Sequence, residues 1–363
     1  MTKVGAINKK FSISFPSAYS HLGAAAFFRS ELEDFRVEEK LGFSLSGQGE
    51  HLYLQIEKRG DNTRWIAQLL AKHFCVDESA VGYCGLKDRR AVAIQWFSVH
   101  LPDNEKLIAP GVVRIEDTRF QLIKSSWHDR KLRRGQHKEN YFTVRLREVS
   151  GDKDLLDFRL KQIASQGVPN YFGEQRFGFN GKNLMEADSL LRREYGAERK
   201  RGQKKRNSPR GGIYLSAARS YLFNLVLAER VRRNCWQSAS KALCSVGKLP
   251  DFSDTGPMWG RGRCMESEEV CRFENKVLLE WTEWMNALEF SGLQQERRQL
   301  VLNPRELSWK WFSHDKISED MFDLEVSFSL PPGSYATSLL HEFLDVKKSY
   351  LEEIPVLATS DSI

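Results

Sequence analysis

The chain has 363 residues, of which 41% are hydrophobic, and these values are typical of a folded protein with room for two domains. It carries 55 Lys and Arg against 48 Asp and Glu, a formal net charge of +7, which favours an acidic partner. No apolar run approaches the roughly 18 residues of a membrane span, and the N-terminus lacks the apolar core of a signal peptide. We therefore expect a cytoplasmic protein without a membrane partner.

Cysteine and histidine spacing gives no sign of a metal site. The six cysteines form no C-x-x-C pair, and we interpret them as free thiols in a reducing compartment. The eight histidines include no H-x-x-x-H pair, and no phosphate-binding glycine motif of either common kind is present. We therefore predict no metal site, and a redox or nucleotide-driven mechanism would need a cofactor site that these patterns do not reveal.

The first regular segments of the chain favour strands. Phe35, Val37 and Glu39 alternate with other residues, which places all three on one face of a strand. Glu39 is then either exposed at the end of the strand or buried beside a cation, because an unpaired buried carboxylate is costly. The alternation over 51–57 predicts a second strand.

A helix is expected after these strands. Asn62 or Thr63 can cap it, and apolar residues recur at helical spacing from Trp65 to Phe74. His73 falls on the apolar stripe, so we interpret it as a core histidine and not as a catalytic base.

The segment 81–99 predicts two strands joined by a charged turn. β-Branched and aromatic residues flank Lys87, Asp88, Arg89 and Arg90. The neighbouring cations favour the ionised form of the Asp88 carboxylate. Taken alone, the pattern also fits an aspartate that only bonds its own turn backbone.

Two segments concentrate positive charge, and 11% of the residues are aromatic. Either segment alone fits a solvated loop, but cations together with aromatic rings favour nucleic acid, whose phosphates and unstacked bases they bind. The RNA-backbone candidates are Arg130, Lys131, Arg133, Arg134, Arg199, Lys200, Arg201, Lys204, Lys205 and Arg206.

A further strand is predicted over 140–148, where Phe142, Val144 and Leu146 share one face. Asn140 lies at its start, directly after the first basic segment. Phe142 is by default a core residue, and the alternative is a ring that stacks on a ligand.

The middle of the chain changes character. Aromatic residues, glycines and amides crowd into 168–178, which predicts a boundary or a structured loop. Ser216 can cap the next helix, with Arg219 and Arg230 outside its apolar stripe. Strand character returns at 324–330. This order predicts a sheet domain interrupted by a largely helical one.

The residues permit chemistry by a lone carboxylate in a basic, aromatic setting. Hydrolysis of a glycosidic bond usually takes two carboxylates and a water molecule. One aspartate with water kept out could instead detach a base from its ribose and rejoin it through carbon. The nucleotide must then leave its stack, and rings and amides must replace its lost partners.

Six motifs, in this order, resemble the TruD family of tRNA pseudouridine synthases. They are Phe35-x-Val37-x-Glu39, Gly85-Leu-Lys-Asp88-Arg-Arg-Ala-Val-Ala-Ile-Gln95, Leu132-Arg-Arg-Gly135 leading to Asn140-x-Phe142, Gly167 to Gly178, Ser216 to Asn224, and Pro332-Gly-Ser-Tyr-Ala-Thr337. The resemblance implies an α+β protein with the pseudouridine synthase fold, a mixed and mostly antiparallel sheet with flanking helices. An inserted, largely helical α+β domain would occupy 166–313, between catalytic segments 1–165 and 314–363.

The resemblance also implies residue roles. Asp88 matches the catalytic aspartate, which either attacks the ribose or abstracts its C2' proton, and both routes stay open. Asn140 matches the amide that holds the aspartate and the flipped nucleotide. Phe142 matches the ring stacked on the target base.

Other matches surround this set. Arg29 resembles the cation that pairs with the catalytic carboxylate. Phe35 and Tyr335 match aromatic residues that line the pocket. Glu39 matches a structural acid, and we place Lys87 with it as a supporting residue.

Three positions depart from the family pattern. Ala93 stands where Thr is common, Glu139 replaces a Gly before Asn140, and His341 replaces an Arg. Glu139 is the most consequential, because it adds a negative charge beside an RNA-facing loop.

The resemblance implies isomerisation of uridine 13 of tRNA to pseudouridine, by a monomer without a cofactor. One alternative is a non-catalytic RNA-binding protein or chaperone on the same scaffold. A second alternative is a synthase that acts on other RNAs. The combination of Asp88, Asn140 and Phe142 favours the enzyme.

Overall fold

The computed structural model describes residues 11–102, 120–195, 211–237, 254–264, 266–313 and 322–348. The chain divides into two compact units. The sheet unit combines Leu22–Ser165, Asn303–Ala336 and Phe343–Ile363, and the helical unit combines Met1–His21, Gln166–Leu302 and Thr337–Glu342. No helix among the described residues is long and apolar enough to cross a membrane.

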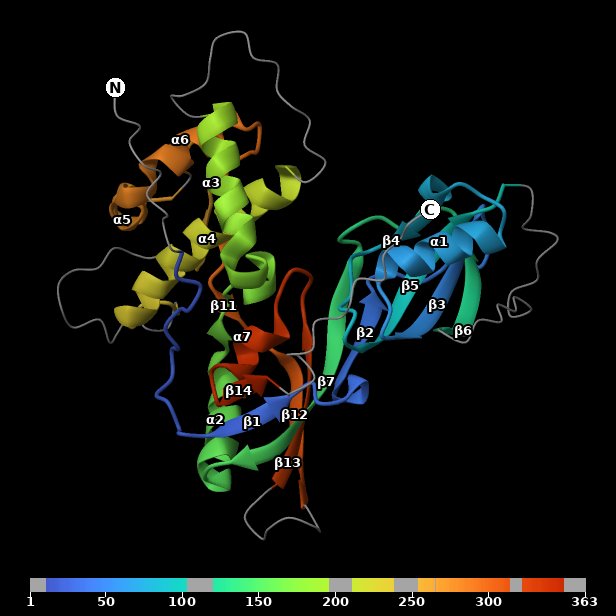
Figure 1. Ribbon diagram of the computed structural model, residues 1–363, viewed down its shortest axis with the longest axis horizontal. Helices are drawn as coiled ribbons and strands as arrows, with labels where there is room; N and C mark the ends of the chain where they lie inside the picture. Colours follow the sequence, from blue (N-terminus) through green and yellow to red (C-terminus); the bar gives the residue numbers. More distant parts are fainter. Residues whose placement is uncertain are drawn as a thin grey trace. The chain divides into compact units, whose positions relative to one another are not determined.

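The sheet unit is built on one ten-stranded sheet within the described residues (Figure 1). Its strands are β1 (Ala25–Phe28), β2 (Phe35–Leu41), β3 (His51–Arg59), β4 (Val81–Tyr83), β5 (Val92–His100), β6 (Phe120–His128), β7 (His137–Ser150), β12 (Arg305–Ser313), β13 (Phe322–Leu330) and β14 (Asp345–Lys348). The main path runs β12-β13-β7-β2-β5-β3-β6. The pairs β2–β5 and β1–β14 are parallel, and the other recorded pairs of this sheet are antiparallel. The expected mixed, mostly antiparallel sheet is confirmed.

Helix α1 (Thr63–His73) covers one face of this sheet (Figure 1). Its buried residues Ile66 and Leu70 pack against the apolar side chains of β3 and β5. The side-chain oxygen of Asn62 accepts the backbone N–H of Trp65 at 2.8 Å, so the expected cap is confirmed. A second helix, α2 (Lys153–Gln166), presents Asp157 to Trp309 Nε1 of β12 at 2.7 Å.

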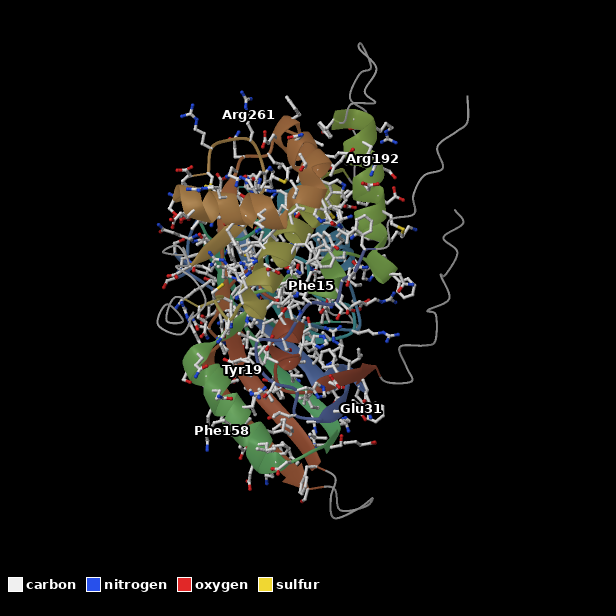
Figure 2. The ribbon with its side chains drawn as sticks, turned by 90° about the vertical axis from the view of Figure 1, so that its left-hand side faces the viewer. Phe15, Tyr19, Glu31, Phe158, Arg192 and Arg261 are labelled. Atoms are coloured by element: carbon white, nitrogen blue, oxygen red, sulfur yellow. A yellow bond between two sulfur atoms is a disulfide. The ribbon has the colours of Figure 1, made fainter. Side chains whose placement is uncertain are left out.

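The helical unit is organised around α4. Its elements are α3 (Lys182–Tyr195), α4 (Gly211–Arg232), α5 (Glu268–Val277), α6 (Thr282–Phe290), the paired strands β8 (Val168–Pro169) with β11 (Val301–Leu302), and β9 (Thr255–Met258) with β10 (Glu296–Gln299). The short helix α7 (Ala336–Leu340) spans a unit boundary. Single 3-10 turns lie at Leu32–Asp34, Glu78–Ala80, Glu174–Arg176, Phe179–Gly181 and Leu279–Trp281. An aromatic cluster packs on α4, where Tyr221 contacts Phe15 (labelled in Figure 2) and Trp281.

The predicted strands at 35–39, 51–57, 81–99, 140–148 and 324–330 are confirmed. The interpretation of His73 is wrong, because its side chain is exposed near the end of α1. His73 lies at the edge of the apolar face of α1, where it no longer packs against the core.

Expectations for α4 are also corrected. Ser216 lies inside the helix and cannot be its cap. Arg219 and Arg230 are 8% and 1% exposed, because α4 is surrounded by the other elements of its unit. Nη2 of Arg219 donates to the backbone carbonyls of Met258 and Gln294 at 2.8 and 2.7 Å, which offsets part of the cost of burying the guanidinium. Because 217–224 is buried without a break, the middle of the helix has no polar face for the sequence to mark.

The interpretation of all cysteines as free thiols is wrong for Cys264 and Cys271, which form a disulfide with Cα atoms 6.5 Å apart. The chain before α5 brings them together without a recognisable spacing motif. Cys75 and Cys84 are free thiols. The basic segment with the candidates Arg199, Lys200, Arg201, Lys204, Lys205 and Arg206 lies outside the described residues.

Candidate active site

Asp88 lies on the loop between β4 and β5, and its side chain is 35% exposed. Hydrogen bonds hold this loop from both sides. Gln95 Nε2 donates to the Gly85 carbonyl at 2.6 Å, and Thr63 Oγ1 donates to Gln95 Oε1 at 3.0 Å. The backbone N–H of Lys87 donates to Thr63 Oγ1 at 3.0 Å. The start of α1 and strand β5 therefore fix the loop that presents the carboxylate.

Lys58 of β3 adds a second anchor for the same loop. Its side chain is fully buried, and Nζ donates to the Asp88 carbonyl at 3.1 Å and the Asp61 carbonyl at 2.6 Å. Burial lowers the pKa of Lys58 to about 8, so the side chain is still mostly protonated at neutral pH. Sequence reasoning missed this residue. The signal was present, because Lys58 continues the alternation of Leu54 and Ile56.

Arg29 pairs with the Asp88 carboxylate, with Nη2 2.6 Å from Oδ2. Its guanidinium carbon lies 4.1 Å from the ring centroid of Phe35 and 4.9 Å from that of Phe28. The Arg29 backbone has φ +59°, a left-handed conformation that residues other than glycine rarely adopt. Such strain persists only where the surroundings enforce it, and it concentrates at functional sites.

Glu39, Lys87 and Asn140 form a buried polar cluster beside this pair. Lys87 Nζ lies 2.8 Å from Glu39 Oε2 and donates to Asn140 Oδ1 at 2.6 Å. The side chains of Glu39 and Lys87 are 0% and 7% exposed. Burial raises the pKa of Glu39, and the Lys87 charge counters this effect. Of the two positions considered for Glu39, the structure has the one buried beside a cation.

Strand β7 places Asn140 opposite Glu39 of β2 and Phe142 opposite Val37. The Phe142 ring packs 5.8 Å from Phe35 and 5.5 Å from Phe328, measured between centroids. It is only 8% exposed, so most of the ring belongs to the core.

Tyr335 follows β13, whose last residue Leu330 pairs with Asn140. Its side chain is half-buried. The contacts form two groups. Arg29 contacts Asp88 and Phe35, whose ring packs on Phe142, and Lys87 contacts Glu39 and Asn140. The chain links the two groups, because Lys87 directly precedes Asp88.

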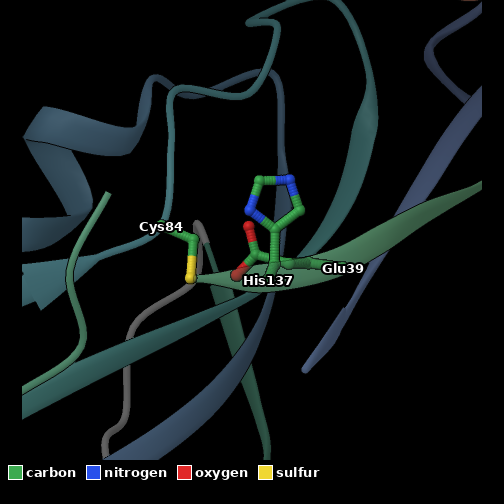
Figure 3. A group of neighbouring side chains, drawn as sticks. All are labelled: Glu39, Cys84 and His137. Atoms are coloured by element: carbon green, nitrogen blue, oxygen red, sulfur yellow. The ribbon is translucent and has the colours of Figure 1, made fainter. Parts of the chain in front are cut away.

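Glu39, Cys84 and His137 bring their donor atoms within 4.8 Å of one another (Figure 3). These residue types can bind transition metals. Burial raises the pKa of the Cys84 thiol to about 12, which disfavours the thiolate that binds metals. Lys87 already supplies a positive charge to Glu39. The contacts therefore fit a structural cluster better than a metal centre.

His137 supports Asn140, since Asn140 Nδ2 and His137 Nε2 are 3.2 Å apart. Burial lowers the pKa of His137 to about 4 from 6.5, so its ring is neutral at pH 7. A neutral Nε2 can accept a hydrogen bond from the Asn140 amide.

This shift predicts a pH-dependent stability. The unfolded chain protonates His137 near pH 6.5, whereas the folded protein does so near pH 4. Stability therefore falls as pH decreases between these values, by about 3 kcal/mol in total. We expect His137→Gln to remove this component in urea unfolding curves measured from pH 7 to pH 4. The exposed variant His73→Gln is the control, and an unchanged pH dependence in His137→Gln would contradict the assignment.

The first basic segment forms the loop between β6 and β7. Arg130, Arg133 and Arg134 are exposed, whereas Leu132 is buried and its N–H donates to Ser98 Oγ at 3.0 Å. Gly82 of β4 allows the close approach, because a side chain there would collide with the Leu132 carbonyl. The loop is therefore fixed to the sheet with its cations toward solvent.

Two further contacts complete this region. The Gly135 N–H donates to the Cys84 carbonyl at 2.8 Å, which joins the basic loop to the start of the Asp88 loop. The charge of Glu139 is met by Arg305, at 3.3 Å. This pairing offsets the negative charge that the sequence departure introduced.

Comparisons with known proteins identify the family of this chain. The family model described as tRNA pseudouridine synthase D (TruD) matches residues 17–198. A tRNA pseudouridine synthase D of Cellvibrio japonicus (strain Ueda107) is 44% identical, over 95% of this chain and 97% of that protein. One of Xanthomonas axonopodis pv. citri (strain 306) is 38% identical, over 91% and 94%. The chain therefore belongs to the TruD family of tRNA pseudouridine synthases.

A solved structure supports the same fold. The Methanosarcina mazei protein described as tRNA pseudouridine synthase D (TruD) superposes with a TM-score of 0.63 at 17% identity, over 91% of this chain and 95% of that chain. At this identity the likeness concerns the fold alone.

Proposed function

We propose that the protein isomerises uridine to pseudouridine in tRNA, at position 13, with Asp88 as the catalytic carboxylate. The observation that carries the proposal is the Arg29–Asp88 pair at 2.6 Å on a loop fixed from two sides, in a chain that belongs to the TruD family. The guanidinium keeps the carboxylate oriented toward one position. A group held in this way reacts without first having to be ordered.

The reaction breaks the bond between C1' of the ribose and N1 of uracil, turns the base, and joins C1' to C5. The proton of C5 is then lost and N1 gains a proton, so substrate and product are isomers. Asp88 either attacks C1' or removes the C2' proton, and both routes need the ionised carboxylate. Phe142 stacks on the target base, and Asn140 and Lys87 hold the polar side of the site. Phe35 and Tyr335 line the pocket. A flipped base needs such contacts to replace its lost stacking.

The catalytic domain comprises the expected segments 1–165 and 314–363, and 166–313 is the inserted domain. The sheet unit holds most of the catalytic segments, whereas Met1–His21 and Thr337–Glu342 belong to the helical unit. The compact division counts Arg305–Ser313 with the sheet, because β12 pairs with β13. The protein acts as a monomer in the cytoplasm, without a cofactor.

The test is incubation of the purified protein with an unmodified tRNA transcript, followed by carbodiimide primer extension. We expect a stop at uridine 13 and none in a transcript with cytidine there. Binding without any pseudouridine would support the alternative of a non-catalytic RNA-binding protein. Modification only in other RNAs would support the second alternative.

The basic loop predicts a salt-dependent affinity. Each cation that contacts a phosphate releases counterions, so tRNA binding weakens with salt in proportion to the number of contacts. We expect the triple variant Arg130→Gln, Arg133→Gln and Arg134→Gln to reduce the slope of log K against log salt by about two to three. Filter binding between low and moderate salt measures the slope, and Arg272→Gln, an exposed change in the helical unit, is the control. An equal slope in wild type and triple variant would contradict phosphate contacts by this loop.

A further inference from the structure

A cavity of about 320 Å³ opens beside the loop that carries Asp88. One wall is the start of α1 and the other is the loop itself, so the cavity lies within the sheet unit. Its lining residues are Asn62, Thr63, Arg64, Trp65, Gln68, Leu86 and Lys87. Its size is at the lower end of the range for small-molecule sites, which suits one planar ring system.

The cavity walls have the chemistry of a nucleobase site. Trp65 is 39% exposed and Leu86 is 61% exposed, so two large apolar side chains remain accessible. Arg64 is exposed beside them, and Gln68 offers an amide. Asn62 uses its side-chain oxygen for the helix cap, and the NH2 group of the same amide provides a donor. Aromatic and guanidinium surfaces stack on bases, and amides bond their edges.

The cavity is also next to the proposed reaction centre along the chain. Leu86 and Lys87 line it, and Asp88 follows directly. Two residues of extended chain span at most about 7 Å. A strand whose target uridine reaches Asp88 therefore brings a neighbouring nucleotide to the cavity. Arg89, which follows Asp88, is exposed and adds a cation, and its Nε donates to the Gly60 carbonyl at 3.1 Å.

We propose that this cavity binds one nucleobase adjacent to the target uridine, stacked on Trp65. The inference rests on the proposed function, because it assumes that the RNA strand passes Asp88. Removing the target from its stack also deprives its neighbour of a stacking partner. Trp65 replaces that partner, so the cavity contributes to holding the opened strand.

The first experiment reads binding without turnover. Transcripts carry 2-aminopurine at each nucleotide next to position 13, and the protein is the Asp88→Asn variant. We expect stacking to quench the fluorescence at one of these positions. The added change Trp65→Ala should abolish the quenching, whereas Trp65→Phe should retain most of it. Phe158→Ala, an exposed aromatic change on α2 (Figure 2), should leave it unchanged.

The second experiment reads turnover. We expect Trp65→Ala to raise KM for tRNA about tenfold with little change in kcat, as for the loss of one base–aromatic stack. An abasic nucleotide at the quenched position should raise the wild-type KM equally, and the combination should add nothing further. Quenching that survives Trp65→Ala, or additive effects on KM, would overturn the inference.

The two experiments separate this inference from the proposed function. If quenching depends on Trp65 but the wild type forms no pseudouridine, the proposed activity is refuted and the cavity is still supported as a base-binding site. If the wild type forms pseudouridine but no adjacent position is quenched, only the base-binding role of the cavity is refuted.

Discussion

Replacement of Asp88 by asparagine is expected to reduce pseudouridine formation at least about a thousandfold, because both routes require an ionised carboxylate that the amide cannot supply. The amide keeps the size of the side chain, and Lys58 and Thr63 still hold the loop backbone. The fold and the affinity for tRNA should therefore change little. Single-turnover assays on an unmodified transcript, with filter binding in parallel, measure both quantities.

The matched control is Asp154→Asn, which makes the same chemical change at an exposed position on α2. It should react at the wild-type rate. Wild-type rates in Asp88→Asn would refute the catalytic assignment, and an equal loss of activity and of folding would show a structural role instead.

Replacement of Lys87 by methionine is expected to have the largest effect on stability. It leaves the Glu39 carboxylate, which is 0% exposed, without its ammonium partner, and such changes cost about 3–5 kcal/mol. The change also removes the donor to Asn140 Oδ1. We therefore expect both a lower free energy of unfolding, measured in urea, and a lower kcat.

The double variant Glu39→Gln and Lys87→Met separates these two effects. A neutral amide no longer needs a buried cation, so most of the lost stability should return. The activity should stay low, because Asn140 Oδ1 still lacks the hydrogen bond from Lys87. Recovery of both quantities would mean that Lys87 matters only for folding. A double variant as unstable as Lys87→Met would show that charge pairing is not the cause.

Local patterns predicted the sheet well, because a half-buried strand reveals its inner face by alternation. Phe35, Val37 and Glu39 are the example, and all three are buried. The same logic failed for α4. The middle of α4 has no solvent-exposed face, so Arg219 and Arg230 were wrongly interpreted as lying on one. Ser216, which is inside the helix, was interpreted as its cap.

The resemblance supplied the members of the site, but the sequence could not supply their contacts. Asn140 was expected to hold the aspartate, whereas its recorded hydrogen bonds join Lys87 and His137. Lys58 was missed because the predicted strand over 51–57 ended one residue before it. Such contacts depend on strands far apart in sequence, and local periodicity carries no information about them.

The pairing of β7 determines when the sheet can be completed during synthesis of the chain. Asn140 and Phe142 lie between β2 and β13, and β13 begins only at Phe322. A nascent chain that ends before Phe322 leaves one edge of β7 open, and unpaired edges invite mispairing. The inserted unit must emerge from the ribosome before that edge is closed. The time needed to synthesise 166–313 is therefore the minimum time for which that edge stays open to mispairing.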